Sequence, residues 1–209
     1  MQMNDLRSVN SSELPRFYQI VDHASWLERF LPLGLQLVQL RIKDKPESFV
    51  KEQIAESKAL CDEFGCQLVV NDHWQEAIDA GCDFVHLGQE DLVDADLEVM
   101  KTNRIKLGIS THDRLELTTA LELNPEYIAL GPIYHTILKA MKWEPQGVDR
   151  VAIWRQLVGD TPLVAIGGLT VERAPVVYDA GADSICVVTD VLLNDNPKDR
   201  LSQWLQLSQ

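Results

Sequence analysis

The chain has 209 residues, of which 45% are hydrophobic, and it carries a formal net charge of -13. This length suits one domain with a substantial core and lies at the short end of the range for a complete (β/α) barrel. The negative charge argues against nonspecific binding to nucleic acid or to an anionic membrane surface, because either partner would repel the chain. An anionic substrate would therefore need a pocket with its own positive charges.

The first residues, MQMNDLRSVNSSELP, are polar, and the sequence contains no run of about 18 uninterrupted apolar residues. We therefore expect a cytoplasmic protein without a membrane partner. We expect residues 1–15 to form a loosely held N-terminal extension and residues 16–209 to form one domain. No CxxC pair occurs, and buried reduced thiols are favoured over a zinc site for the four cysteines, Cys61, Cys66, Cys82 and Cys186.

Apolar runs rich in Val, Ile and Leu recur along the chain, and each is followed by a stretch with helical periodicity, as in successive βα units. In chain order these runs predict eight strands, at residues 17–22, 35–43, 67–71, 83–87, 104–109, 126–131, 162–167 and 183–189. Several runs are apolar on both faces, which is typical of buried parallel strands. The pattern predicts an α/β fold, a single-domain (β/α)8 TIM barrel, in preference to an open doubly wound sheet.

The segment after the second strand predicts a well-defined helix. Pro46 suits the first helical position, an apolar stripe follows it, and Gly65 suits the C-terminal cap. Gly81 and Gly181 similarly follow EAIDA and VVYDA, and each leads directly into a strand. These repeated endings favour a fold built of similar units.

Side chains alternate between the faces of a strand, so Gln39, Arg41 and Lys43 share one face of the second strand. Two cations cannot face an apolar helix layer cheaply, because an unpaired buried charge costs several kcal/mol. We therefore expect them to line the barrel mouth at the C-terminal ends of the strands, where barrel enzymes carry their active sites.

Polar residues and glycines follow most of the other strands as well: Asn71, Asp72, Gln89, Asp91, Ser110, Gly167, Gly168 and Thr189. Taken alone, Ser110 is better explained as a helix cap. The connection at 132–146 is longer than its neighbours and contains Thr136, Lys139 and Lys142. Its length and its lysines are typical of a binding loop or a lid.

The motifs on which this argument rests also occur together in one known family. They are QLRIK at 39–43, VND at 70–72, HLGQED at 86–91, GIS at 108–110, GPIYHTILK at 131–139, QG at 146–147, AIGGL at 165–169 and VVT at 187–189. In this order and spacing the chain resembles thiamine phosphate synthases across nearly all of its length after residue 17. The resemblance implies a Mg²⁺-dependent transferase of thiamine biosynthesis. Its reaction would join 4-amino-2-methyl-5-(diphosphooxymethyl)pyrimidine, the pyrimidine diphosphate, to 4-methyl-5-(2-phosphooxyethyl)thiazole, the thiazole phosphate, and release pyrophosphate.

The resemblance also implies a role for individual residues. Asp72 and Asp91 would bind Mg²⁺, because this ion prefers carboxylate, phosphate and water oxygens. The pyrimidine diphosphate would be bound by Gln39, Arg41, Lys43, Asn71, Ser110 and Lys139, and the thiazole phosphate by Thr136, Leu138, Gly168, Val188 and Thr189. Arg41, Lys43 and Lys139 would act catalytically by stabilising charge on the departing diphosphate. No general base is implied, since the attacking thiazole nitrogen carries no proton.

Two positions depart from the family pattern. The loop often reads PTxTK in the family, whereas here one proline and one hydroxyl are absent, and Leu138 could contribute only its backbone N–H. Thr189 followed by Asp190 replaces the usual Ser-Ala. A carboxylate beside a phosphate would repel it, so we expect Asp190 to point away, toward the N-terminus of the following helix.

Three other functions are consistent with parts of the pattern. A thiazole tautomerase would share the phosphate site but needs an acid or base rather than a diphosphate pocket. A catalytically silent relative would bind thiazole phosphate as a sensor, and a sugar-phosphate epimerase would share only the paired glycines. The retained Asp72, Asp91, Arg41 and Lys43 favour the synthase. His86 is interpreted as a hydrogen-bonded structural residue, and homo-oligomer formation stays open.

Overall fold

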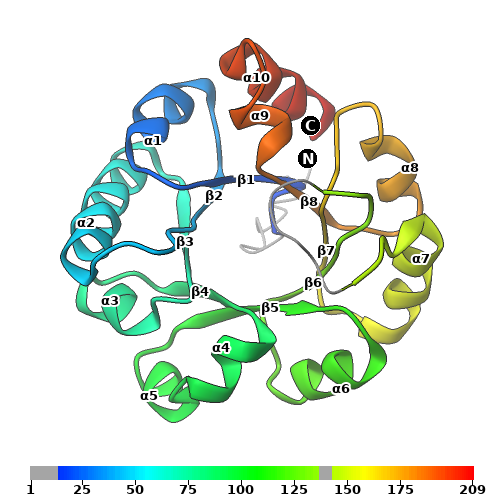
Figure 1. Ribbon diagram of the computed structural model, residues 1–209, viewed down its shortest axis with the longest axis horizontal. Helices are drawn as coiled ribbons and strands as arrows, with labels where there is room; N and C mark the ends of the chain where they lie inside the picture. The colour runs from blue at the N-terminus through cyan, green and yellow to red at the C-terminus, as the bar shows by residue number, and fades with distance from the viewer. Residues whose placement is uncertain (1–13, 137–142) are drawn as a thin grey trace, which may run out of the picture.

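The computed structural model describes residues 14–136 and 143–209 of the chain. Eight parallel strands pair in sequence order and close into a barrel in which β8 returns to β1 (Figure 1). The strands are β1 (Phe17–Val21), β2 (Leu37–Leu40), β3 (Gln67–Asn71), β4 (Phe84–Leu87), β5 (Lys106–Thr111), β6 (Tyr127–Leu130), β7 (Leu163–Ile166) and β8 (Ser184–Val187). The closed barrel and all eight strands predicted from the sequence are confirmed.

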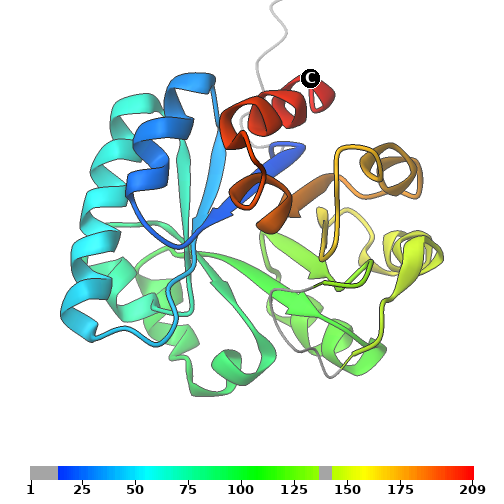
Figure 2. The same ribbon diagram turned by 45° about the horizontal axis from the view of Figure 1, so that its top comes forward.

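Helices surround the barrel on all sides (Figure 1). They are α1 (Ser25–Phe30), the 3-10 helix η1 (Leu31–Leu33), α2 (Glu47–Phe64), α3 (Trp74–Asp79), α4 (Gln89–Asp94), α5 (Leu97–Thr102), α6 (Arg114–Glu122), α7 (Gly147–Val158), α8 (Ala174–Asp179), α9 (Thr189–Leu192) and α10 (Pro197–Leu207). Helix α2 packs against β3, as the tilted view of Figure 2 shows. It ends at Gly65 as predicted, but Pro46 directly precedes its first turn instead of forming part of it.

The strands contribute side chains to two apolar clusters. The larger cluster lies between the barrel and the helices and includes Leu27, Trp154 and Trp204. The smaller cluster contains strand residues and no helix residues, so it fills the barrel interior: Tyr18, Ile20, Leu37, Val69, Phe84, Tyr127, Ala129, Val164 and Cys186. Successive residues of a strand point alternately into the two clusters, which explains why the strands are apolar on both faces. The four cysteines are buried and unpaired, as the sequence predicts.

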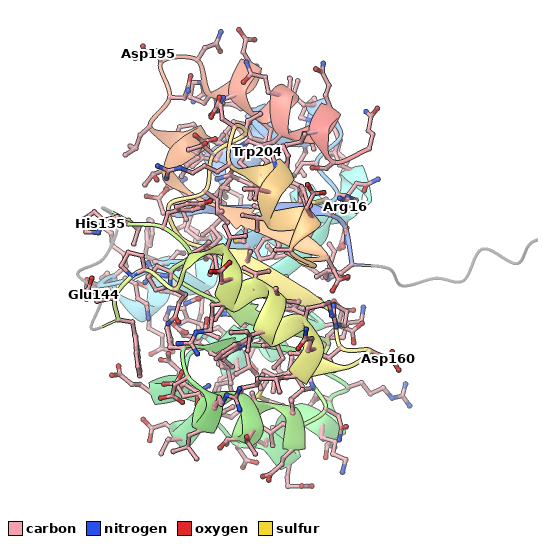
Figure 3. The ribbon with its side chains drawn as sticks, turned by 90° about the vertical axis from the view of Figure 1, so that its right-hand side faces the viewer. Arg16, His135, Glu144, Asp160, Asp195 and Trp204 are labelled. Atoms are coloured by element: carbon pink, nitrogen blue, oxygen red, sulfur yellow. The ribbon has the colours of Figure 1, made fainter. Side chains whose placement is uncertain are left out.

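The two ends of the barrel differ in what they carry. His135, which follows β6, and Glu144 lie at one end of the molecule in Figure 3, while Arg16, which precedes β1, lies at the other. The first of these ends is therefore the one where the strands have their C-termini. Within residues 14–136 and 143–209, no helix combines the length and hydropathy that a membrane span requires.

Candidate active site

A cavity of about 500 Å³ opens at the C-terminal ends of the strands. Most of the residues predicted from the sequence line it together: Arg41, Lys43, Asn71, Asp72, Asp91, Ser110, Thr136, Gly168, Val188 and Thr189. Gln39 points to the same side of β2 but lies deeper, is 1% exposed and does not line the cavity. Leu138 and Lys139 lie outside the described residues.

Lys43 and Asp72 form an ion pair at the mouth of the barrel, between the ends of the neighbouring strands β2 and β3. Lys43 follows β2, and Asp72 follows β3 with a left-handed backbone, at a φ of 64°. The backbone N–H of Asp72 donates to the carbonyl of His86, at 2.9 Å, so the turn after β3 is fixed to β4. This unusual conformation turns the Asp72 carboxylate toward the cavity rather than along the strand.

The carboxyl groups of Asp72 and Asp91 lie close enough to interact directly. Asp91 lies in the first turn of α4, after Gly88, where an added Cβ would come within 3.0 Å of the Asp91 Oδ2 atom. Burial raises the pKa of Asp91, and the charge of Asp72 and the contact with it raise this pKa further, while Lys43 opposes the effect. Two acidic groups held together in this way form a site suited to a cation.

The described residues contain no group of three or more His, Cys, Asp or Glu side chains arranged to hold a metal ion. The Asp72 and Asp91 pair would therefore have to share any ion with oxygens from a ligand or from water. Mg²⁺ is commonly bound in this way, through one or two carboxylates together with substrate phosphates. The donor set fits this ion better than Zn²⁺, which prefers nitrogen and sulfur ligands.

Asn71 presents an unsatisfied amide in the wall of the cavity. Its side chain is buried at 5% exposure, and its Nδ2 atom has no hydrogen-bond partner among the residues that the structure describes. A buried donor left unpaired costs about 1–3 kcal/mol, so such an atom indicates a position where a ligand would supply the acceptor.

A chain of hydrogen bonds runs up through the barrel interior to the cavity. The Tyr18 and Tyr127 hydroxyls are 3.1 Å apart, the Tyr127 hydroxyl is 2.8 Å from His86 Nδ1, and His86 Nε2 is 2.8 Å from Ser110 Oγ. The side chain of Gln39 also reaches the Tyr127 hydroxyl. Burial lowers the pKa of His86 to about 4, so the imidazole is uncharged near neutral pH. The interpretation of His86 as a hydrogen-bonded residue is confirmed.

On the opposite wall, Gly168 is packed against the start of the sixth connection. Its φ is 63°, and an added Cβ would lie 2.4 Å from the carbonyl oxygen of His135 and 2.8 Å from Tyr134 Cβ. Only glycine fits both this backbone conformation and this contact. Arg173 donates to the Gly168 carbonyl and thereby holds the turn in place.

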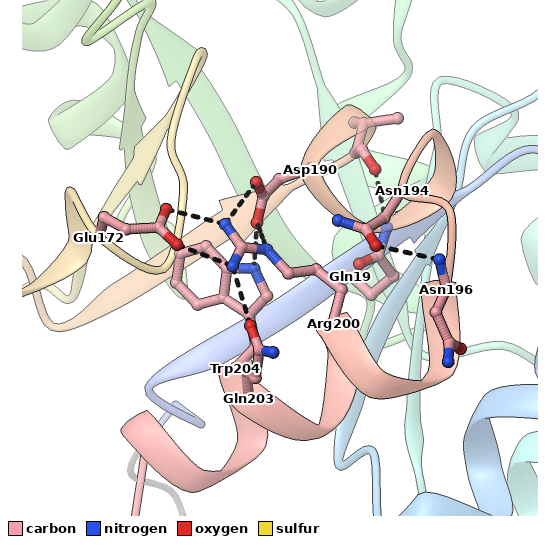
Figure 4. A network of polar contacts seen from close by, with 9 residues as sticks. Gln19, Glu172, Asp190, Asn194, Asn196, Arg200, Gln203 and Trp204 are labelled. Atoms are coloured by element: carbon pink, nitrogen blue, oxygen red, sulfur yellow. Dashed lines mark hydrogen bonds and ion pairs between the residues drawn. The ribbon is translucent and has the colours of Figure 1, made fainter.

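Asp190 points away from the cavity, as predicted, but its partners differ from those expected (Figure 4). It accepts hydrogen bonds from Arg200 Nε at 2.8 Å and from Trp204 Nε1 at 2.7 Å. Both residues lie in the body of α10, so the expectation of a helix N-terminus was wrong. An Arg side chain and an indole N–H satisfy this carboxylate more completely than backbone donors at a helix end would.

The rim of the cavity contains contacts that the sequence did not indicate. The rings of Trp143 and His112 are stacked, with centroids 5.5 Å apart and planes 5° apart. Glu116 Oε2 accepts hydrogen bonds from the backbone N–H and the Nδ1 atom of His112, at 2.7 and 2.8 Å. The only available signal was the spacing of His112 and Glu116, which is equally typical of an exposed helix face.

Comparisons with known proteins point to one family. A family model described as thiamine monophosphate synthase matches residues 17–191. A thiamine-phosphate synthase of Rhizobium etli is 59% identical over 92% of this chain and 94% of its own. The one from Photorhabdus laumondii is 42% identical over 91% of this chain and 88% of its own.

Solved structures share the fold at lower sequence identity. A thiamine phosphate pyrophosphorylase from Pyrococcus furiosus superposes with a TM-score of 0.82 at 23% identity, covering 92% of this chain and 95% of its own. A structure described as native KDPGal superposes with a TM-score of 0.71 at 13% identity, covering 94% of this chain and 95% of its own. At these identities the likeness concerns the barrel and not the chemistry.

Proposed function

The chain belongs to the thiamine monophosphate synthase family and is a transferase of thiamine biosynthesis, and from this we propose that its cavity joins the pyrimidine diphosphate to the thiazole phosphate with release of pyrophosphate. The observation that carries the proposal is the meeting of Arg41 and the Lys43–Asp72 ion pair with Asp91 in one cavity. An isomerase acting on the thiazole alone would have no use for this group of charges. The relatives at 59% and 42% identity are thiamine-phosphate synthases, and they independently favour the synthase over the tautomerase, sensor and epimerase alternatives.

We propose that Asp72 and Asp91 bind Mg²⁺ together with oxygens of the diphosphate. Their contact and the raised pKa of Asp91 support this assignment, because a divalent cation would relieve the repulsion between the two carboxylates. When bound, Mg²⁺ supplies positive charge that offsets the negative charge of the leaving diphosphate.

The protein's own cations and donors act on the same leaving group. Arg41 can bind two diphosphate oxygens at once through its planar guanidinium, and Lys43 adds a point charge. The Nδ2 atom of Asn71, which has no partner within residues 14–136 and 143–209, supplies a further donor from the cavity wall. Lys139 is proposed as a third cation from the family resemblance alone.

The reaction needs no proton transfer. The bond between the pyrimidine CH₂ and the diphosphate oxygen breaks, and its electron pair leaves with the diphosphate. The lone pair of the thiazole nitrogen then forms the new C–N bond and gives the thiazolium product. The uncharged His86 is consistent with this scheme, which requires charge stabilisation and exclusion of water rather than a base.

The thiazole phosphate is proposed to bind at the opposite wall, near Thr136, Gly168, Val188 and Thr189. The absent side chain at Gly168 lets the backbone approach a phosphate closely, and barrels often bind phosphate after strands seven and eight. Asp190 does not oppose this assignment, because Arg200 and Trp204 hold its carboxylate away from the cavity. Leu138 is proposed as a further contact through its backbone N–H.

The test is to mix the purified protein with both substrates, with and without Mg²⁺, and to measure thiamine phosphate and pyrophosphate. We expect both products in equal amounts, and only with Mg²⁺. Asp72→Asn and Asp91→Asn should each lose most of the turnover, whereas Asp94→Asn, an exposed position on the same helix as Asp91 and outside the cavity, should keep it. Full turnover in either of the first two variants would reject its metal role. Isomerisation of the thiazole phosphate without coupling would reject the synthase reaction.

We also propose that the protein works in the cytoplasm. Cys61, Cys66, Cys82 and Cys186 are unpaired and buried, which suits a reducing compartment.

A further inference from the structure

We propose that Tyr127 and His86 are positioning residues that hold the Ser110 hydroxyl as a hydrogen-bond donor toward the diphosphate. The inference rests on the proposed function in one respect, since it takes the anion in the cavity to be the pyrimidine diphosphate. It extends that function by giving a role to two buried residues, His86 in the wall of the cavity and Tyr127 beneath it.

The proposed direction of the hydrogen bonds begins at Tyr18. The Tyr18 and Tyr127 hydroxyls are 3.1 Å apart and either can be the donor; in the proposed arrangement Tyr18 donates and the Tyr127 oxygen accepts. The Tyr127 hydroxyl then has its own proton to give. The acceptor within reach is His86 Nδ1, at 2.8 Å.

The tautomer of His86 follows in turn. The imidazole is buried, which favours the uncharged ring with a single N–H. If Nδ1 accepts from Tyr127, the ring proton must be on Nε2, and Nε2 then donates to Ser110 Oγ at 2.8 Å. Ser110 Oγ thereby accepts a hydrogen bond from His86, and its own O–H can donate into the cavity that it lines.

The opposite tautomer would reverse the chain. A proton on Nδ1 would donate to Tyr127 and leave Nε2 as an acceptor, and Ser110 would then turn its O–H toward His86. Only oxygen lone pairs would face the cavity, and these repel a diphosphate. Tyr127 therefore determines whether Ser110 presents a donor or an acceptor, although it lies beneath the cavity and does not line it.

A second contact holds the Ser110 backbone in place and does not involve the Ser110 hydroxyl. Gln89 Nε2 donates to the Ser110 backbone carbonyl at 2.7 Å, which fixes the end of β5. The hydroxyl is thus oriented by His86, whereas the backbone is oriented by Gln89.

The first experiment reads the tautomer directly in the free protein. The ¹⁵N shifts of the His86 ring, assigned by their loss in His86→Gln, should show a proton on Nε2 and none on Nδ1 at neutral pH. In Tyr127→Phe the proton should shift partly to Nδ1. A proton on Nδ1 in the unaltered protein would overturn the inference. This result does not depend on turnover, so it can be told apart from a failure of the proposed reaction.

The second experiment is a double-mutant cycle on kcat/KM for the pyrimidine diphosphate. As a single substitution, Tyr127→Phe should lower this constant about 10-fold, as expected for loss of a hydrogen bond to a charged group. In the Ser110→Ala background the same substitution should change it by less than about 2-fold, because the two residues act as one unit. Equal losses in both backgrounds would overturn the inference.

The control for this cycle removes a tyrosine hydroxyl contact outside the cavity. Tyr178 donates to the carbonyl of Arg16 at 2.6 Å, at the end of the barrel away from the cavity. Tyr178→Phe should leave kcat/KM unchanged even if it lowers the thermal stability. A loss comparable to that of Tyr127→Phe would attribute the effect to general destabilisation and would overturn the positioning role.

Discussion

Asp72 and Asp91 hold their carboxyl groups close together although Asp72 follows β3 and Asp91 lies in the first turn of α4. Folding brings these two acidic groups together at an energetic cost, and a bound cation would offset that cost. The contact therefore links metal binding to stability.

The first prediction concerns this link. Without added metal, Asp91→Asn should raise Tm slightly, because it removes the repulsion with Asp72. Addition of Mg²⁺ should raise Tm of the unaltered protein but not of the variant, since binding to the folded state alone stabilises it. Thermal unfolding in EDTA and in millimolar Mg²⁺ measures both effects. An equal Mg²⁺ response in the two proteins would place the ion elsewhere.

The second prediction concerns Gly168. An alanine there would combine a strained backbone, at a φ of 63°, with a Cβ 2.4 Å from the His135 carbonyl. Gly168→Ala should therefore cost about 1–3 kcal/mol in the free energy of unfolding and raise KM for the thiazole phosphate. Gly65→Ala is the matched control, because its φ is 66° but nothing lies within 4 Å of the added Cβ. It should cost less and leave KM unchanged, and equal effects of the two substitutions would reject the close approach.

The third prediction concerns the Trp143–His112 stack, which joins the end of the sixth connection to the turn after β5. If this stack helps to exclude water, Trp143→Ala should increase the fraction of pyrimidine diphosphate that is hydrolysed instead of coupled. Trp143→Phe should retain most of the coupling, since a phenyl ring can still stack on His112. Product ratios from both substrates measure the partition, and an unchanged ratio in Trp143→Ala would contradict the role.

The fourth prediction is a dependence of stability on pH. Hydrogen bonds from Arg200 lower the pKa of Glu172 to about 2, from an ordinary value of 4.5. Because the folded-state pKa is depressed, the stabilisation is present above pH 4.5 and is lost as pH falls toward 2. Glu172 is largely exposed, so the effect should be below about 1 kcal/mol. Urea unfolding should show Glu172→Gln less stable than the unaltered protein at pH 7 and equal to it near pH 2. A stability difference between the two proteins that does not change with pH would exclude the ion pair as its cause.

The sequence predicted the barrel and much of the cavity because both depend on short-range regularities. Alternation along one strand is enough to place Arg41 and Lys43 on the inner face, and strand ends of a parallel barrel meet at one rim. Alternation does not indicate how deep in the barrel a side chain lies, however. It groups Gln39 with the same two residues, whereas the structure places Gln39 below the cavity beside Tyr127.

The contacts that the sequence did not predict join residues that are distant along the chain. Tyr18 and Tyr127 are 109 residues apart, and each alone is indistinguishable from an aromatic core residue. The stacking role of Trp143 likewise becomes visible only when the position of His112 is known. Asp190 was correctly predicted to avoid the phosphate, but its partners depend on how α10 packs, which no local pattern specifies.

The attachment of Asp190 to α10 has a consequence for biosynthesis on the ribosome. A nascent chain that has reached residue 190 already contains all eight strands, yet Arg200 and Trp204 have not been made. Trp204 also stacks on Phe17 of the first strand, with ring centroids 5.0 Å apart. The contacts that fix the turn after β8 can thus form only after translation has passed residue 204. The cavity therefore reaches its final structure late in synthesis.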